Sequence, residues 1–214
     1  MVKLEKGAHM PDVNLAVIYY SATGTVHTMA ERLAAAGQKA GAQVRLRQVA
    51  ELAPDEAIAS NAGWSQHFDR TKNEPRAIPE DVTWADAVLF GTPTRYGNVA
   101  SQLKQFLDTL GPQWVQGLLS DKVYAGFTAT QTAHGGQEST LLALYQTIHH
   151  FGGIIVSPGY TDPIKFADGN PYGVSHVTGP TNSDALSEAE NGALDHLADR
   201  AIMIAGRLKA GAAV

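Results

Sequence analysis

One stretch near the N-terminus constrains the fold more than any other part of the chain. Residues 15–20, Leu-Ala-Val-Ile-Tyr-Tyr, form a nearly unbroken apolar run, which is typical of a central parallel strand covered on both faces. A short loop of small and hydroxylated residues follows, and apolar residues then recur with helical spacing from Val26 to Ala34. The sequence therefore predicts a buried strand, a tight loop and a helix that continues to about Ala40.

The loop between this strand and this helix has the chemistry of a phosphate site. A helix N-terminus presents free backbone N–H groups and partial positive charge, and Ser21, Thr23 and Thr25 add hydroxyl groups there. Neither G-x-x-x-x-G-K-[ST] nor G-x-G-x-x-G follows the strand, and the loop contains no lysine or arginine. This donor set favours one terminal monophosphate over a triphosphate or a pyrophosphate. The alternative is an ordinary turn with a Ser/Thr helix cap.

The rest of the chain alternates strands with helices. Further strands are predicted at residues 43–49, 86–90, 123–127 and 154–156, and further helices around residues 99–110, 141–148 and 187–208. The last helix has a candidate capping box, Ser187-x-x-Glu190. Alternating strands and helices imply right-handed crossovers and an α/β fold with a doubly wound, five-stranded parallel sheet. We expect the strand order 2-1-3-4-5, with helices on both faces.

Two segments are longer than such connections require. Residues 55–81 are polar and weakly periodic, and residues 157–182 are rich in glycine and proline without a helical pattern. We expect a single domain over residues 11–214 with inserts at these two places. The first insert is expected to be a lid or an oligomer contact anchored by Trp64 and Phe68, and a loose surface insertion is the alternative.

Composition excludes several classes of function. The chain has no cysteine, which excludes disulfides, thiolate catalysis and Cys-ligated metal sites. A formal net charge of −5 argues against a general nucleic-acid binder. We find no membrane-length apolar run and no signal-peptide core, so we expect a cytoplasmic location. The histidines show no tight metal-ligand spacing and there is no G-x-S-x-G elbow, so neither a metal site nor a hydrolase is expected. Residues 1–10 fit no element and are expected to be a cloning remnant or a disordered N-terminus.

Three polar loops are expected to meet at one edge of the sheet. Residues 21–26, 92–98 and 128–138 each follow a predicted strand, and ligands of doubly wound sheets bind beyond the carboxyl ends of the strands. The second loop has glycines that permit close approach, with Arg95 as a donor and Tyr96 as an aromatic face. The third offers backbone and hydroxyl donors. Together they suit a planar polar ring with one phosphate tail, which is flavin mononucleotide (FMN).

The motifs of these loops resemble the WrbA family of NAD(P)H:quinone oxidoreductases. Residues 20–25, Y-S-A-T-G-T, are similar to a flavodoxin-type phosphate loop. Residues 91–98, G-T-P-T-R-Y-G-N, resemble the family signature G-T-P-T-R-[FY]-G-N, and residues 134–138, H-G-G-Q-E, are similar to its third loop. The resemblance extends over residues 15–208 and implies a flavodoxin-like fold and a homotetramer.

The resemblance also implies roles for individual residues. The implied cofactor-binding residues are Ser21, Ala22, Thr23, Gly24, Thr25, Val26, Pro93, Thr94, Arg95, Tyr96, Gly97, Ala129, Thr130, Gln131, Thr132 and Gly135. Trp114 is implied to line the substrate side of the ring, and Thr23 to touch the nicotinamide nucleotide. His150 is the candidate catalytic residue, reaching a flavin that can belong to a neighbouring subunit.

By the same resemblance the chain is expected to be an enzyme. It would take hydride from NADH or NADPH onto FMN and then reduce a quinone in the same slot, in a ping-pong reaction. The alternative is a flavodoxin-like one-electron carrier or regulatory flavoprotein, although such carriers are usually shorter and more acidic. A protein-binding module is a third interpretation, which no basic, amphipathic or repeated segment supports.

Overall fold

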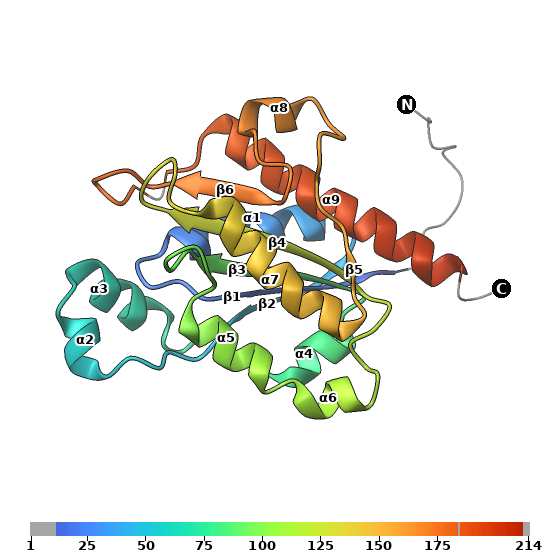
Figure 1. The fold of residues 1–214 in the computed structure, drawn as a ribbon, viewed down its shortest axis with the longest axis horizontal. Helices are drawn as coiled ribbons and strands as arrows, with labels where there is room; N and C mark the ends of the chain where they lie inside the picture. The colour runs from blue at the N-terminus through green and yellow to red at the C-terminus, as the bar shows by residue number, and fades with distance from the viewer. Residues whose placement is uncertain (1–11, 184, 212–214) are drawn as a thin grey trace.

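The computed structural model describes residues 12–183 and 185–211, so the expected N-terminal remnant, residues 1–10, lies outside the described residues. A parallel sheet forms the centre of the molecule, with helices on both faces (Figure 1). The strands are β1 (Asn14–Tyr19), β2 (Gln43–Gln48), β3 (Ala87–Pro93), β4 (Val123–Thr130), β5 (Ile154–Ile155) and β6 (Val174–Val177). The helices are α1 (Thr25–Lys39), α2 (Asp55–Ala59), α3 (Ala62–Thr71), α4 (Pro79–Trp84), α5 (Ser101–Asp108), α6 (Gly111–Val115), α7 (Gln137–Phe151), α8 (Ile164–Asp168) and α9 (Glu188–Gly211).

The predicted strand order is confirmed. The strands run β2-β1-β3-β4-β5, and the pairs are parallel. Along β1, Leu15 and Val17 enter the core between the sheet and the helices α1 and α9, whereas Ala16 and Ile18 enter the core on the other face. Both faces of β1 are therefore covered, which explains why its sequence is continuously apolar rather than alternating.

The sheet has a sixth strand that the sequence did not predict. β5 pairs with Val123 and Tyr124 at the start of β4, and β6 pairs with the four residues that end β4. The two short strands thus lie on the same side of β4, and the chain between them leaves the sheet to form α8. The second insert thus contains a helix and a strand that its sequence does not reveal, because five and four residues are too few to show a periodicity.

Residues 55–81, which are only weakly periodic in sequence, fold into α2, α3 and the start of α4. Asn61 caps α3 by accepting a hydrogen bond of 3.0 Å from the Trp64 backbone. The Trp64 indole donates to Glu51 Oε2 at 3.0 Å, so Trp64 does anchor the insert, while Phe68 is half-buried. These short helices depend on tertiary contacts that a local pattern does not reveal.

The last helix begins as its capping box predicts. The Ser187 backbone N–H donates to Glu190 Oε2 at 2.7 Å, and the Glu190 backbone N–H donates to Ser187 Oγ at 3.2 Å. Across the described ranges, no helix is both long enough and apolar enough to span a bilayer.

Candidate functional site

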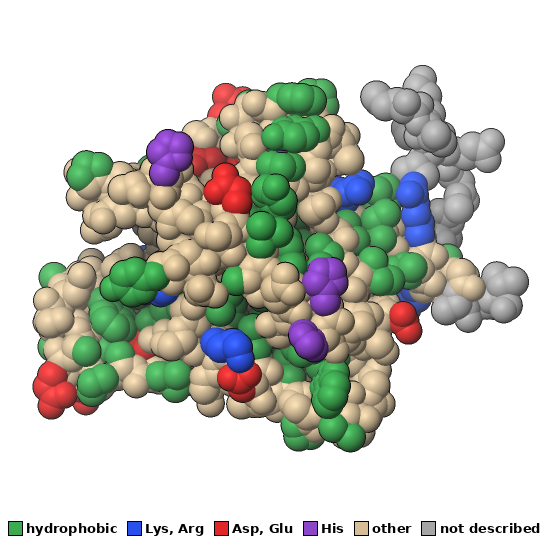
Figure 2. All heavy atoms as spheres, in the orientation of Figure 1, with side chains coloured by type: hydrophobic (Ala, Val, Ile, Leu, Met, Phe, Trp, Pro, Cys, Tyr) green, Lys and Arg blue, Asp and Glu red, His purple; other side chains and the backbone are tan. Residues whose placement is uncertain are grey.

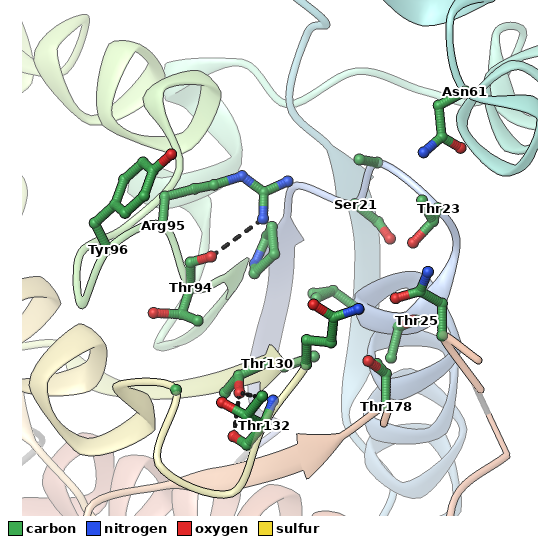
Figure 3. Close-up of a pocket in the computed structure, with 17 residues that line it drawn as sticks. Ser21, Thr23, Thr25, Asn61, Thr94, Arg95, Tyr96, Thr130, Thr132 and Thr178 are labelled. Atoms are coloured by element: carbon green, nitrogen blue, oxygen red, sulfur yellow. Dashed lines mark hydrogen bonds between the residues drawn. The ribbon is translucent and has the colours of Figure 1, made fainter. Parts of the chain in front are cut away.

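A cavity of about 580 Å³ lies beyond the carboxyl ends of β1, β3 and β4 (Figure 3). It is lined by Ser21, Ala22, Thr23, Thr25, Val26, Asn61, Pro93, Thr94, Arg95, Tyr96, Ala129, Thr130, Gln131, Thr132, Gly135, Thr178 and Asn182. The structure therefore brings together residues of all three predicted loops. Of the sixteen expected cofactor-binding residues, Gly24 and Gly97 lie beside the cavity wall rather than in it.

The first loop leaves the N-terminus of α1 open. Its N-cap residue is Gly24, with φ of +108°, and no described side chain caps the helix. Ser21 Oγ accepts instead from the Gly24 backbone N–H at 3.1 Å. The ordinary Ser/Thr cap is therefore not formed, and the first-turn N–H groups of α1 remain available to an anion.

The absence of a cation from this loop is compensated by a distant segment. A Cβ atom built on Gly24 would lie 3.5 Å from Arg70 Nη2 and 3.6 Å from His67 Nδ1. Both residues belong to α3, in the first insert. Positive charge thus approaches the first loop from a helix whose contact with it could not be read from the local sequence.

The second loop is a tight two-residue hairpin. The Arg95 backbone N–H donates to the Asn98 carbonyl at 2.8 Å, and the Asn98 N–H donates back at 3.0 Å. Tyr96 and Gly97 between them have φ of +53° and +77°, as a type I′ turn requires. Tyr96 is therefore a non-glycine residue in a strained conformation, and its ring is fully exposed. Such strain at a cavity rim is typical of a functional position.

The third loop is fixed to the second. The Thr94 backbone N–H donates to the Ala129 carbonyl at 2.9 Å, and a Cβ atom on Gly136 would lie only 2.9 Å from Gly97 Cα. Within the third loop, Thr130 Oγ1 donates to the Thr132 carbonyl at 2.6 Å. The two loops are therefore held together, and the glycines at their contact allow the close approach. The part of the cavity lined by residues 93–96 and 129–135 is called the slot.

Three lining residues, Asn61, Thr178 and Asn182, were missed by the sequence analysis. Asn61 enters from the first insert, and the other two come from the segment after β6. That segment is anchored by buried His176, whose Nδ1 lies 2.7 Å from Glu190 Oε1 and whose Nε2 lies 2.9 Å from the Ser183 carbonyl. These two contacts tie the segment after β6 to α9 through Glu190.

Trp114 and His150 lie elsewhere in the chain. His150 is near the C-terminal end of α7, whereas the cavity is near the helix's N-terminal end. Trp114, in α6, is half-exposed. The predicted roles of these two residues would therefore require the cavity of a second chain.

The cavity fits the group that the sequence indicates. The open first turn of α1 and its hydroxyl groups suit a phosphate, and the slot between the second and third loops suits a flat polar ring. Within residues 12–183 and 185–211, no group of three or more histidine, aspartate or glutamate side chains is arranged to hold a metal ion.

Comparisons with known proteins agree with this geometry. Residues 13–162 match the NADPH-dependent FMN reductase family. An NAD(P)H dehydrogenase (quinone) of Deinococcus radiodurans is 42% identical over 92% of this chain and 97% of its own length. One of Rhodopseudomonas palustris is 38% identical over 81% and 87%. The crystal structure of a flavodoxin, WrbA-like protein from Agrobacterium tumefaciens superimposes with a TM-score of 0.63 at 25% identity, covering 92% of this chain and 99% of that one.

Proposed function

The chain belongs to the NADPH-dependent FMN reductase family and, within it, to the WrbA-type proteins, and on that basis we propose that it is an FMN-dependent NAD(P)H:quinone oxidoreductase. When bound, FMN would supply the redox chemistry for a two-electron transfer from NADH or NADPH to a quinone in a ping-pong order. The chain's own residues bind and orient the reactants.

The observation that carries this proposal is the joining of two features in one cavity. An uncapped helix N-terminus lies at one end, and a slot between two mutually fixed loops lies at the other. We assign the phosphate to the first-turn N–H groups of α1 with the hydroxyls of Ser21, Thr23 and Thr25. Thr23 faces the cavity beside Asn61, which supports its proposed contact with the nicotinamide nucleotide.

The ring is assigned to the slot, where donors on both loops can reach its polar edge. The Arg95 guanidinium donates to the Thr94 carbonyl at 3.1 Å, so four of its five N–H groups remain for a ligand. Gln131 and Thr132 line the same cavity from the third loop. The exposed Tyr96 ring can stack on a nicotinamide or a quinone at the mouth of the slot.

A homotetramer is part of the proposal, because it would give Trp114 and His150 a flavin to act on. Side chains over α6 are apolar and exposed, with Trp114 at 53% and Val115 at 76%, and two histidines lie beside them at the end of α7 (Figure 2). An exposed apolar patch of this kind favours association. The cytoplasmic location stays a prediction.

Steady-state kinetics separate this function from one-electron transfer. We expect FMN-loaded protein to oxidise NADH or NADPH rapidly with benzoquinone, with parallel double-reciprocal plots. Protein that accumulates in a one-electron-reduced form without turnover would instead favour the carrier.

A further inference from the structure

Helix α3 of the first insert lies along the loop of residues 20–26. At one end, a Cβ atom on Gly63 would lie 3.8 Å from Thr23 Cγ2. At the other end, a Cβ atom on Gly24 would lie 3.5 Å from Arg70 Nη2. Helix α3, which lies outside the doubly wound core, thus packs against the loop at two points.

The position of the Arg70 guanidinium is set by a buried histidine. Arg70 Nη2 lies 3.2 Å from Nδ1 of His67, whose residue is only 3% exposed. A guanidinium can only donate, so Nδ1 is the acceptor and the ring is neutral. Burial, with His27, Arg70 and Arg76 nearby, lowers the pKa of His67 to about 4. The acceptor therefore persists at neutral pH.

The charge of Arg70 is not neutralised by a carboxylate. Its neighbour in sequence, Asp69, pairs with Lys72 at 3.0 Å, and Glu31 faces His27 Nε2 at 3.3 Å. Among the residues that the structure describes, Arg70 forms no salt bridge. An oriented cation without a counter-ion therefore lies against the N-cap glycine of α1.

We propose that Arg70, oriented by His67, makes this site prefer a phosphorylated flavin to the same flavin without its phosphate. The inference rests on the proposed function. A phosphate monoester carries about −1.5 to −2 charges at pH 7, and the loop itself supplies only dipoles and hydroxyls. Arg70 adds a full positive charge close to that phosphate. Arg70 does not line the cavity, so the ring's surroundings do not depend on it.

The test compares two charge-removing variants of the same segment in flavin-free protein. Titration with FMN and with riboflavin, followed by quenching of flavin fluorescence, gives both dissociation constants. Arg70→Gln should weaken FMN binding roughly tenfold and leave riboflavin binding unchanged. Lys72→Gln removes the same net charge from an exposed ion pair and should change neither constant. Arg70→Lys should keep most of the preference.

Salt dependence provides a second readout. FMN affinity of the parent chain should fall more steeply with ionic strength than that of Arg70→Gln. Suppose the parent binds FMN and oxidises NAD(P)H. If Arg70→Gln and the parent then had the same ratio of FMN affinity to riboflavin affinity, the role of Arg70 would be overturned and the proposed function would stand. A parent chain that bound neither flavin would overturn the proposed function and this inference together.

Discussion

The Trp114 indole N–H donates a hydrogen bond of 2.7 Å to the carbonyl oxygen of His150. The two residues therefore form one unit that joins α6 to the end of α7, on a face away from their own cavity. If both act at a flavin, as the family resemblance implies, they act on the flavin of another subunit.

Trp114→Glu should lower assembly and quinone turnover together. A carboxylate in an exposed apolar patch disfavours its burial against another chain, while FMN binding by each chain should persist. Light scattering during gel filtration and kcat/KM for a quinone measure the two effects. Phe166→Glu, an equivalent change at an exposed position of α8, should alter neither. A Trp114→Glu protein that stayed assembled and fully active would contradict the proposed role.

Gly24→Glu should abolish FMN binding. The substitution forces a left-handed conformation on a side chain, directs that side chain at Arg70 Nη2 and His67 Nδ1, and brings a negative charge to the loop that is assigned to the phosphate. Gly41→Glu is a matched control, because Gly41 also has positive φ, at +88°, and no described atom lies within 4 Å of its Cβ position. We expect the purified Gly24→Glu protein to be colourless and the control to be yellow. Equal flavin content in both would disprove the phosphate assignment.

Stability should fall on acidification through His67. Its pKa is about 4 in the folded protein against an ordinary value of 6.5, so between these values the unfolded chain binds more protons. The contribution of His67 to the free energy of unfolding is therefore fully present above pH 6.5. It is lost as the pH falls toward 4, and the loss is at most about 3 kcal/mol. Urea unfolding of the parent and of His67→Leu at several pH values measures the difference. Parallel pH profiles of the two proteins would show that His67 contributes nothing to the pH dependence of the free energy of unfolding.

Tyr96→Asn should stabilise the fold and impair function. Asparagine tolerates the left-handed turn, so removal of the strain at φ +53° should raise the free energy of unfolding by about 1 kcal/mol. Loss of the ring should raise KM for NAD(P)H or quinone. Asp121→Asn introduces the same residue at another left-handed position, φ +60°, away from the cavity, and should leave both KM values unchanged. If Tyr96→Asn left both KM values unchanged, Tyr96 would not face a substrate.

Much of the fold could be predicted because its signals are local. The apolar run of β1 is buried on both faces, and the Ser187–Glu190 capping box marks the start of α9. Parallel topology then brings the ends of successive strands to one edge, so three separate loops could be assigned to one site.

The parts of the site that could not be predicted from the sequence depend on contacts between distant segments. His67 and Arg70 reach Gly24 because α3 folds back over the first loop, and no periodicity in residues 55–81 specifies that packing. Asn182 reaches the cavity only because His176 anchors the segment after β6 to Glu190 and the Ser183 carbonyl. Short elements of this kind are stabilised by tertiary structure rather than by intrinsic propensity.

A crystal structure of the chain with added FMN tests the central claim most directly. We predict one FMN per chain, with its phosphate at the first turn of α1 and its ring in the slot between the second and third loops. A structure obtained with excess FMN in which the cavity held no flavin, or in which the phosphate lay away from Ser21, Thr23 and Thr25, would contradict the account.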